Sequence, residues 1–277
     1  MNSRIQGQSA TTTAKMCAGL ALDDTGTGGN RPPLVLLHGL TFDRRIWAPI
    51  ISALREVDPD RRVISVDLPG HGESPPLPSH DLPRLIEVLH AALGDAAVQA
   101  PVLVGHSISG AIASLYAGVY PAAGVVNVDQ PPLIAEFAQL VRSIEPQLRG
   151  PDFGELWQRI FFTSFHTELL PPDARELVTA NSQPRQDIVL SYWQTLLEVP
   201  VAEIVALIDD TSTRITERAI PYLLVLGHQL AAADEASLRE QMPAIQIHLW
   251  AGTGHFPHLA RPAAFAGLLD GTAQWRR

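Results

Sequence analysis

Residues 105–110 read GHSISG and contain two serines two positions apart. The apolar residues before them predict a buried strand, and the small residues after them are typical of a helix. A serine between such a strand and helix lies at the carboxyl edge of a parallel sheet, where its side chain projects into a ligand-binding crevice. This turn needs very small neighbours two positions away on either side. Ser107 has Gly105 and Ser109 there, whereas Ser109 would lie inside the helix, so Ser107 is the predicted nucleophile.

Two further segments contain groups that a serine nucleophile requires. LLHGLT, residues 36–41, ends a strand in His-Gly and leaves the amide of Leu40 pointing into the crevice. Together with the amide of Ile108 it would form a pair of donors for an oxyanion. GTGHFPH, residues 252–258, places His255 in a glycine loop after the last strand, where a general base of near-neutral pKa is expected. His38 and His106 flank the predicted site and are expected to shape it.

Composition and charge exclude several classes of protein. The 277 residues have a formal charge of −9 with scattered basic residues, so a nucleic-acid or anionic-membrane partner is not expected. A single cysteine allows no internal disulfide. We find no signal-peptide core and no run of the roughly 18 apolar residues that a membrane span needs. The expectations are a cytoplasmic protein and a flexible tail over residues 1–13.

Short apolar strands alternate with helical segments along most of the chain, which predicts a parallel sheet covered on both faces. Residues 15–24 are expected to form a strand, and residues 82–93 a helix. The interval 131–219 breaks the alternation, because it is helical in pattern, punctuated by prolines and rich in aromatic residues. We therefore predict an α/β core over 14–130 and 220–277, with a helical cap over 131–219. Predicted pocket residues from this cap are Phe137, Trp157, Phe161, Phe162 and Trp193.

The motifs HGLT, DLPGHGES, GHSISG and GTGHFPH together resemble those of the α/β-hydrolase superfamily, in its order and spacing, over roughly residues 16–270. The resemblance implies an eight-stranded, mostly parallel sheet with helices on both faces, a cap inserted after the sixth strand, and a nucleophile–acid–histidine triad. Serine as nucleophile points to the esterase- and lactonase-like branch. It argues against dehalogenases and epoxide hydrolases, which use aspartate.

The acid of the triad departs from the commonest pattern of the superfamily. Most relatives place it after the seventh strand, where this chain has Leu230. Asp234 and Glu235 follow that position and look like the exposed start of a helix. The superfamily's other location is the end of the sixth strand, which here reads VVNVDQPP. Asp129 is therefore the predicted acid, with Asp234 and Glu235 left open as alternatives.

These residues predict a serine hydrolase, without cofactor or metal, that cleaves a carboxylic ester or lactone of an apolar small molecule. Ser107 attacks the carbonyl, His255 takes its proton and Asp129 orients the histidine. We expect a monomer or a homodimer. Two alternatives remain: the cofactor-independent dioxygenases of heteroaromatic rings, which this chain resembles in its acid position, and a ligand-binding or receptor protein on the same fold.

Overall fold

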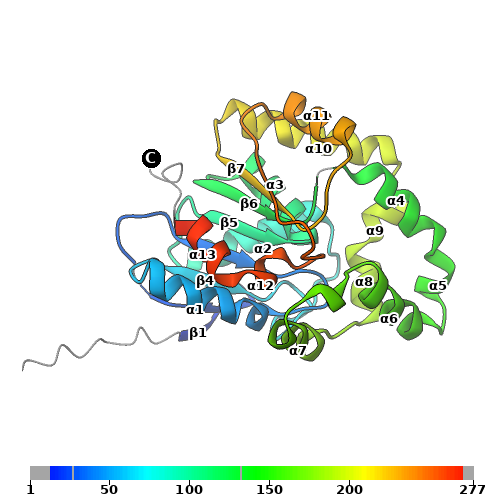
Figure 1. Cartoon of the computed structure of the whole chain (residues 1–277), viewed down its shortest axis with the longest axis horizontal. Coiled ribbons are helices and arrows are strands. Elements are labelled where there is room, and N and C mark those ends of the chain that lie inside the picture. Colours follow the sequence, from blue (N-terminus) through cyan, green and yellow to red (C-terminus); the bar gives the residue numbers. More distant parts are fainter. Residues whose placement is uncertain (1–12, 27, 132, 271–277) are drawn as a thin grey trace, which may run out of the picture.

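A computed structural model describes residues 13–26, 28–131 and 133–270, and of Phe161 and Phe162 it describes the backbone only. Eight strands form one sheet in the order β1-β2-β4-β3-β5-β6-β7-β8 (Figure 1). The two pairings of β2, with β1 and with β4, are antiparallel, and all others are parallel. The strands are β1 Thr13–Cys17, β2 Leu20–Asp24, β3 Leu34–Leu37, β4 Val63–Val66, β5 Val102–His106, β6 Gly124–Val128, β7 Tyr222–Leu226 and β8 Gln246–Leu249.

The central strands are apolar throughout because both faces of the sheet are covered. Every residue of β3, β5, β6 and β7 is buried. Successive side chains point to opposite faces, so that Val35 and Leu37 belong to one apolar cluster, and Leu34 and Leu36 belong to the other. The mostly parallel eight-stranded sheet predicted from the family resemblance is confirmed.

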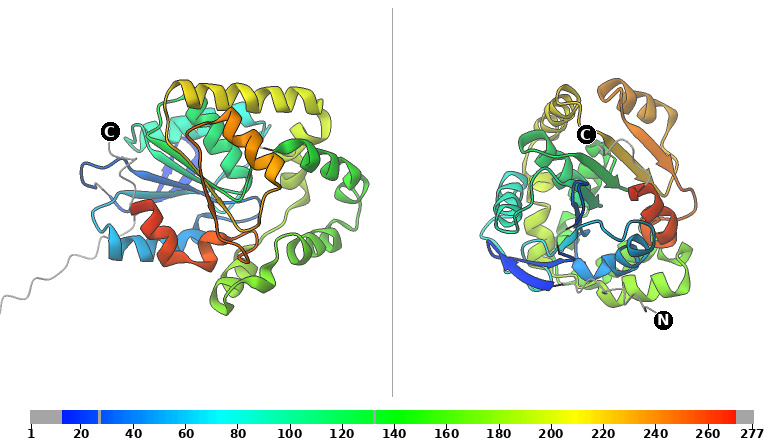
Figure 2. Two further views of the ribbon diagram at one scale, coloured as in Figure 1. Left: turned by 45° about the horizontal axis from the view of Figure 1, so that its top comes forward. Right: turned by 90° about the vertical axis from the view of Figure 1, so that its left-hand side faces the viewer.

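Helices cover both faces of this sheet (Figure 2). One face carries α2 Leu82–Asp95, α3 Ile108–Val119 and α10 Val201–Glu217, which pack side by side. The other carries α1 Ala48–Val57, α12 Pro257–Ala260 and α13 Pro262–Asp270. The predicted helix over 82–93 is observed as α2, which begins after the N-cap Asp81, whose carboxylate accepts the amide of Arg84. α11 Ala232–Gln241 lies between β7 and β8 in sequence.

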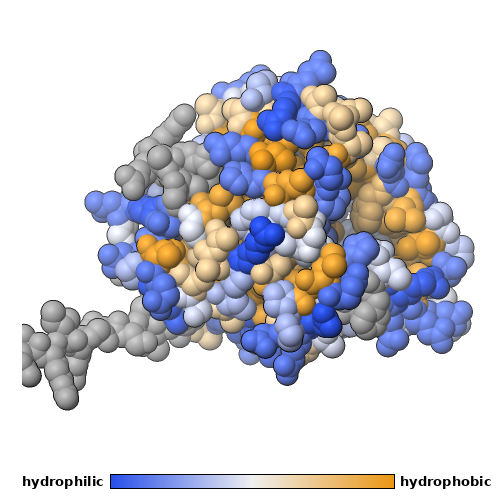
Figure 3. All heavy atoms as spheres, in the orientation of Figure 1, coloured by the Kyte–Doolittle hydropathy of each residue, from blue (hydrophilic) through white to orange (hydrophobic). Residues whose placement is uncertain are grey.

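Between β6 and α10 the chain leaves the sheet and forms a group of short helices, drawn on the right of Figure 1. They are α4 Ile134–Ser143, α5 Glu145–Arg149, α6 Phe153–Thr163, α7 Pro172–Asn181, α8 Gln186–Tyr192 and α9 Gln194–Glu198. Apolar side chains reach the surface among charged ones over this part of the molecule (Figure 3), and Leu140 on α4 is 56% exposed. The division into core and cap at 131–219 stays a prediction. Within that interval α10 packs against α3 in the layer beside the sheet.

The predicted single strand over residues 15–24 is wrong, because the chain reverses there. β1 and β2 pair as an antiparallel hairpin, and Ala18 and Gly19 both have positive φ between them. A glycine inside a strand pattern is the local signal of such a turn. Residues 1–12 of the expected tail lie outside the described residues. In the part of the chain that the structure describes, no helix has the length and apolarity needed to cross a membrane.

Candidate active site

The predicted nucleophile Ser107 lies at a sharp turn between β5 and α3. Its φ of 55° and ψ of −132° place a non-glycine residue in a strained conformation, which is the backbone expected of a nucleophile elbow. The amide of Ser107 donates to the carbonyl of Val128 over 2.9 Å, so the end of β6 holds the turn in place. The Ser107 side chain therefore stands at the carboxyl edge of the sheet, at the first turn of α3.

The residues on either side of Ser107 explain why this turn requires small side chains. A Cβ at Gly105 would lie 2.0 Å from the carbonyl oxygen of Ser109, so no other residue fits there without a backbone shift. Ser109 takes the position where the superfamily usually has glycine, and it is fully buried. Its hydroxyl donates to the carbonyl of His38. Ser109 thus ties the first turn of α3 to the segment that carries Leu40.

The predicted base and the predicted acid are in direct contact. Nδ1 of His255 lies 2.8 Å from Oδ2 of Asp129, which fixes the tautomer that leaves Nε2 free to accept a proton. The amide of His255 donates to the carbonyl of Phe165 over 3.0 Å, and His106 donates from Nε2 to the carbonyl of His255 over 2.8 Å. The His255 side chain is 15% exposed, so it is sheltered but reachable.

Asp129 is buried, and three donors surround its carboxylate. Burial alone would raise the pKa of Asp129, but His228, His255 and the amide of Gly227 outweigh that effect and hold the pKa well below its usual range. The backbone turns sharply at Asp129, with a φ of 58°. The alternative acids are placed elsewhere: Asp234 and Glu235 lie in the first turn of α11, where Glu235 pairs with Arg239.

Sequence reasoning missed His71, which supports the segment predicted to form the oxyanion hole. Nε2 of His71 accepts the amide of Thr41 over 3.1 Å, and Thr41 follows the buried Leu40 at a positive φ. Nδ1 of His71 donates to the carbonyl of Pro69 over 3.1 Å. Burial lowers the pKa of His71 to about 3, so the ring stays neutral and keeps its acceptor. Its position inside DLPGHGES was the available signal.

We predict that the free energy of unfolding falls as the pH decreases below about 6.5. A histidine whose pKa is lower in the folded state than in the unfolded chain favours folding at pH values above the unfolded pKa, about 6.5. This contribution to stability is lost as the pH falls from 6.5 towards 3. The loss from His71 alone is about 1.4 kcal/mol per pH unit in this window. Denaturant unfolding at several pH values should show a shallower slope for His71→Gln, which keeps an acceptor for Thr41. Equal slopes in His71→Gln and the wild type would contradict this assignment.

An aromatic residue of the predicted cap, Phe165, lies directly against the predicted base. Its ring stacks on His255 with centroids 4.7 Å apart and planes 21° apart. Phe165 also meets Trp157 edge to face, with ring centroids 6.4 Å apart, and the centroid of Trp157 lies 5.8 Å from that of Trp193. The predicted pocket residues Trp157 and Trp193 are thus buried in one aromatic cluster that reaches His255 through Phe165.

We predict that Phe165→Leu lowers kcat about 3- to 10-fold on an ester substrate. Leucine preserves the backbone carbonyl that accepts the His255 amide but removes the ring that restricts the imidazole, and a side-chain stack of this kind is worth about 1 kcal/mol. Phe153→Leu is the matched control, because the buried Phe153 stacks on Trp157, with ring centroids 5.9 Å apart, rather than on His255. Equal losses in the two variants would contradict a specific effect on the base.

The remaining predicted pocket residues have different surroundings. His38 is fully buried, with Nε2 accepting the amide of Leu68 and Nδ1 donating to the carbonyl of Gly39, and burial lowers its pKa. His106 is also fully buried and lies 4.8 Å from His255 between ring centroids. Phe137 is half-buried beside Trp193. The side chains of Phe161 and Phe162 lie outside the described residues.

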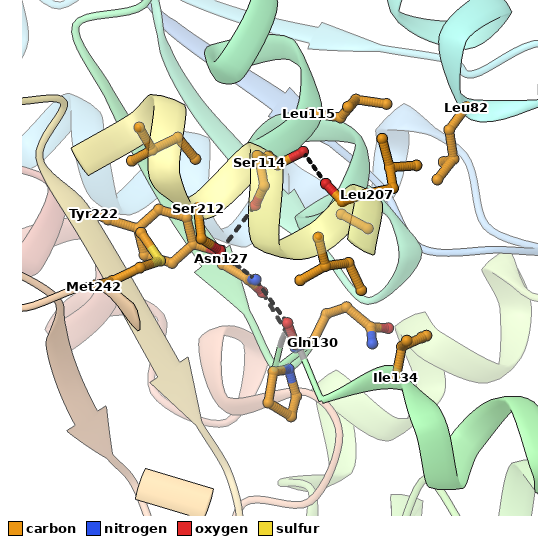
Figure 4. Close-up of a pocket in the computed structure, with 15 residues that line it drawn as sticks. Leu82, Ser114, Leu115, Asn127, Gln130, Ile134, Leu207, Ser212, Tyr222 and Met242 are labelled. Carbon is orange, nitrogen blue, oxygen red and sulfur yellow. Dashed lines mark hydrogen bonds between the residues drawn. The ribbon is translucent and has the colours of Figure 1, made fainter. Parts of the chain in front are cut away.

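A small cavity of about 60 Å³ lies beside α3, between this helix, α10 and the strands β6 and β7 (Figure 4). Asn127 donates there to the hydroxyl of Tyr222 over 2.8 Å, and Gln130 directly follows the predicted acid. Its apolar lining includes Leu82, Leu115, Ile134, Leu207 and Met242. Among the side chains that the structure describes, none of those predicted for the substrate pocket lines this cavity.

Comparison with known proteins agrees with the observed fold. The chain is 29% identical over 249 residues to the biotin biosynthesis bifunctional protein BioHC of Cellvibrio japonicus, covering 84% of this chain and 45% of that longer protein. It is 27% identical to the pimeloyl-[acyl-carrier protein] methyl ester esterase of Yersinia enterocolitica, covering 87% of this chain and 93% of the esterase. A crystal structure of E-2-(acetamidomethylene)succinate hydrolase superposes with a TM-score of 0.71 at 16% identity, covering 94% and 98% of the two chains. A model of the alpha/beta hydrolase family matches residues 34–268, and the chain therefore belongs to the α/β-hydrolase family.

Proposed function

We propose that the protein is a serine hydrolase that cleaves a carboxylic ester of a small molecule through an acyl-enzyme intermediate. The observation that carries this proposal is the 2.8 Å contact between Nδ1 of His255 and Oδ2 of Asp129, on the same sheet edge as the strained Ser107. A histidine fixed in this tautomer by a buried carboxylate serves as general base for a neighbouring hydroxyl. The esterase named among the relatives supports an ester as the substrate.

In the proposed reaction Oγ of Ser107 attacks the ester carbonyl while Nε2 of His255 takes the hydroxyl proton. The negative charge that develops on the carbonyl oxygen is stabilised by the amides of Leu40 and Ile108. His255 then returns the proton to the departing alkoxide, which leaves as the alcohol. A water molecule then loses a proton to His255 and attacks the acyl carbonyl. His255 passes this proton to Oγ of Ser107 as the acyl bond breaks, which releases the acid and restores the Ser107 hydroxyl. Asp129 stays ionised throughout and stabilises the imidazolium.

We further propose that the substrate has an apolar acyl or alkoxy group and is either an open ester or a lactone. The support is the aromatic cluster of Phe165, Trp157 and Trp193, which begins at the face of His255. Aromatic walls beside a few polar groups are typical of sites for apolar small molecules. Phe137, Trp157, Phe161, Phe162 and Trp193 remain the residues proposed to contact the substrate.

Two measurements on the intact chain test the proposed function. Nitrophenyl esters of increasing acyl length should release nitrophenol, with a kcat/KM that rises with chain length as more apolar surface is buried. A fluorophosphonate should add one phosphonyl group, and peptide mass analysis should locate it on Ser107. A protein that neither turns over these esters nor gains mass on Ser107 is not a serine hydrolase.

A further inference from the structure

The acid Asp129 has a second imidazole beside it, on the oxygen that His255 does not use. Nδ1 of His228 lies 3.4 Å from Oδ1 of Asp129, and the amide of Gly227 donates to the same oxygen over 2.9 Å. His228 follows β7, the strand after which most of the superfamily places its acid. In this chain that segment therefore supplies donors to a carboxylate that comes from β6.

The position of His228 is fixed by close packing of the backbone beneath it. A Cβ at Gly227 would lie 1.8 Å from the carbonyl oxygen of Gly254, so the segment after β7 is pressed against the loop that carries His255. The His228 side chain is 58% exposed and Asp129 only 3%. Protons can therefore reach His228 from solvent while its partner carboxylate stays buried.

We propose that His228 is a positioning residue that shares the carboxylate of Asp129 with His255 and adjusts, through its own charge, how strongly that carboxylate stabilises a protonated His255. The titratable groups around the carboxylate of Asp129 are His228 after β7, His255 in the loop after β8, and two buried histidines, His106, 4.8 Å from His255, and His258, 4.7 Å from His106. This inference rests on the proposed function.

The sign of the effect follows from the charges. With His228 neutral, one carboxylate faces one imidazolium when His255 is protonated. With His228 protonated, the same carboxylate faces two cations, and protonation of His255 becomes less favourable. His255 then stays an active base at lower pH, but the imidazolium that forms during acyl transfer is stabilised less.

Two substitutions of opposite electrostatic effect test the proposal. His228→Gln removes the positive charge at every pH, and His228→Lys keeps a positive charge throughout the active range. The side chain at position 228 is exposed enough to tolerate either substitution. We expect the midpoint of the acid limb of kcat/KM in His228→Gln to lie roughly half to one pH unit above that in His228→Lys and above the wild type. At pH 8, kcat of His228→Lys should be about 3- to 10-fold below wild type. The exposed His90→Gln should follow the wild-type curve.

The same shift is measurable without turnover, from the NMR titration of the ring protons of His255 in each variant. A midpoint for His255 that is higher in His228→Gln than in His228→Lys supports the shared carboxylate even if no ester is cleaved, which separates this inference from the proposed function. Equal midpoints in the two variants would overturn it. A shift of the His255 midpoint in the same direction from the wild type in both variants would also overturn it. Such a result would mean that the midpoint responds to loss of the His228 imidazole and not to the charge that replaces it.

Discussion

Ser107→Ala should lower kcat on nitrophenyl esters by at least about 10³-fold while the protein stays folded. The hydroxyl is the attacking group in the proposed reaction, and residual activity from the oxyanion donors and substrate binding is all that remains without it. Alanine also removes no hydrogen bond that holds the turn, since the contact with Val128 uses the backbone amide of Ser107. Steady-state kinetics and fluorophosphonate labelling of the variant measure the loss.

Ser109→Ala is the matched control for this substitution. Ser109 is two residues away, buried, and donates its hydroxyl to the carbonyl of His38. Its loss leaves a buried acceptor short of one donor and should cost about 1 kcal/mol of stability, with kcat changed by less than about tenfold. If instead Ser109→Ala abolished labelling and Ser107→Ala did not, the assignment of the two serines would be reversed.

Comparison of Ser107→Ala with the wild type also separates the proposed hydrolase from its two alternatives. In a cofactor-independent dioxygenase the His255–Asp129 pair deprotonates the substrate, so oxygen uptake with a hydroxy-quinolone would survive Ser107→Ala. A ligand-binding protein would show tight binding and negligible turnover in wild type and variant alike. Each of these results contradicts the acyl-enzyme reaction.

Much of the fold could be predicted because its signals are local. Apolar strands of four or five residues, each followed by small residues or glycine, mark the central sheet, and the same pattern places Ser107 at its edge. The hairpin at Ala18–Gly19 was missed because its two short strands read as one continuous apolar segment. The sequence also could not show that α10 packs on α3 beside the sheet, because a helix in that layer and a helix of a cap have the same periodicity.

The site was predictable where one residue acts through its own motif and less so where distant segments meet. His255 follows from its glycine loop. Asp129 required a choice between two strands, because a carboxylate that ends a strand has the same local pattern whether it caps a turn or orients a histidine. The contacts of His71 with Thr41 and of His228 with Asp129 join residues far apart in the chain, and a single sequence does not show such pairings.

The second large effect is expected from Asp129→Asn, which should lower kcat by roughly 10³- to 10⁴-fold with little change in KM. The amide group of asparagine that faces Nδ1 of His255 would either donate to it or accept from it without a charge. A donated hydrogen bond moves the histidine proton to Nε2, where it blocks the base, and a neutral acceptor leaves the imidazolium without its counter-ion. Both outcomes weaken stabilisation of the transition state rather than substrate binding, so kcat falls while KM changes little.

Asp234→Asn and Glu235→Gln are the controls for that prediction, because both residues lie in the first turn of α11. We expect each to retain nearly wild-type kcat, with a change in stability within about 0.5 kcal/mol. The pH profile adds an independent check, because the ionised Asp129, with its pKa held well below the usual range, should show no titration of its own in the active range. A loss of activity in Asp234→Asn combined with an active Asp129→Asn would move the acid to the segment after β7. The 2.8 Å contact between His255 and Asp129 would then be a structural hydrogen bond rather than part of a triad.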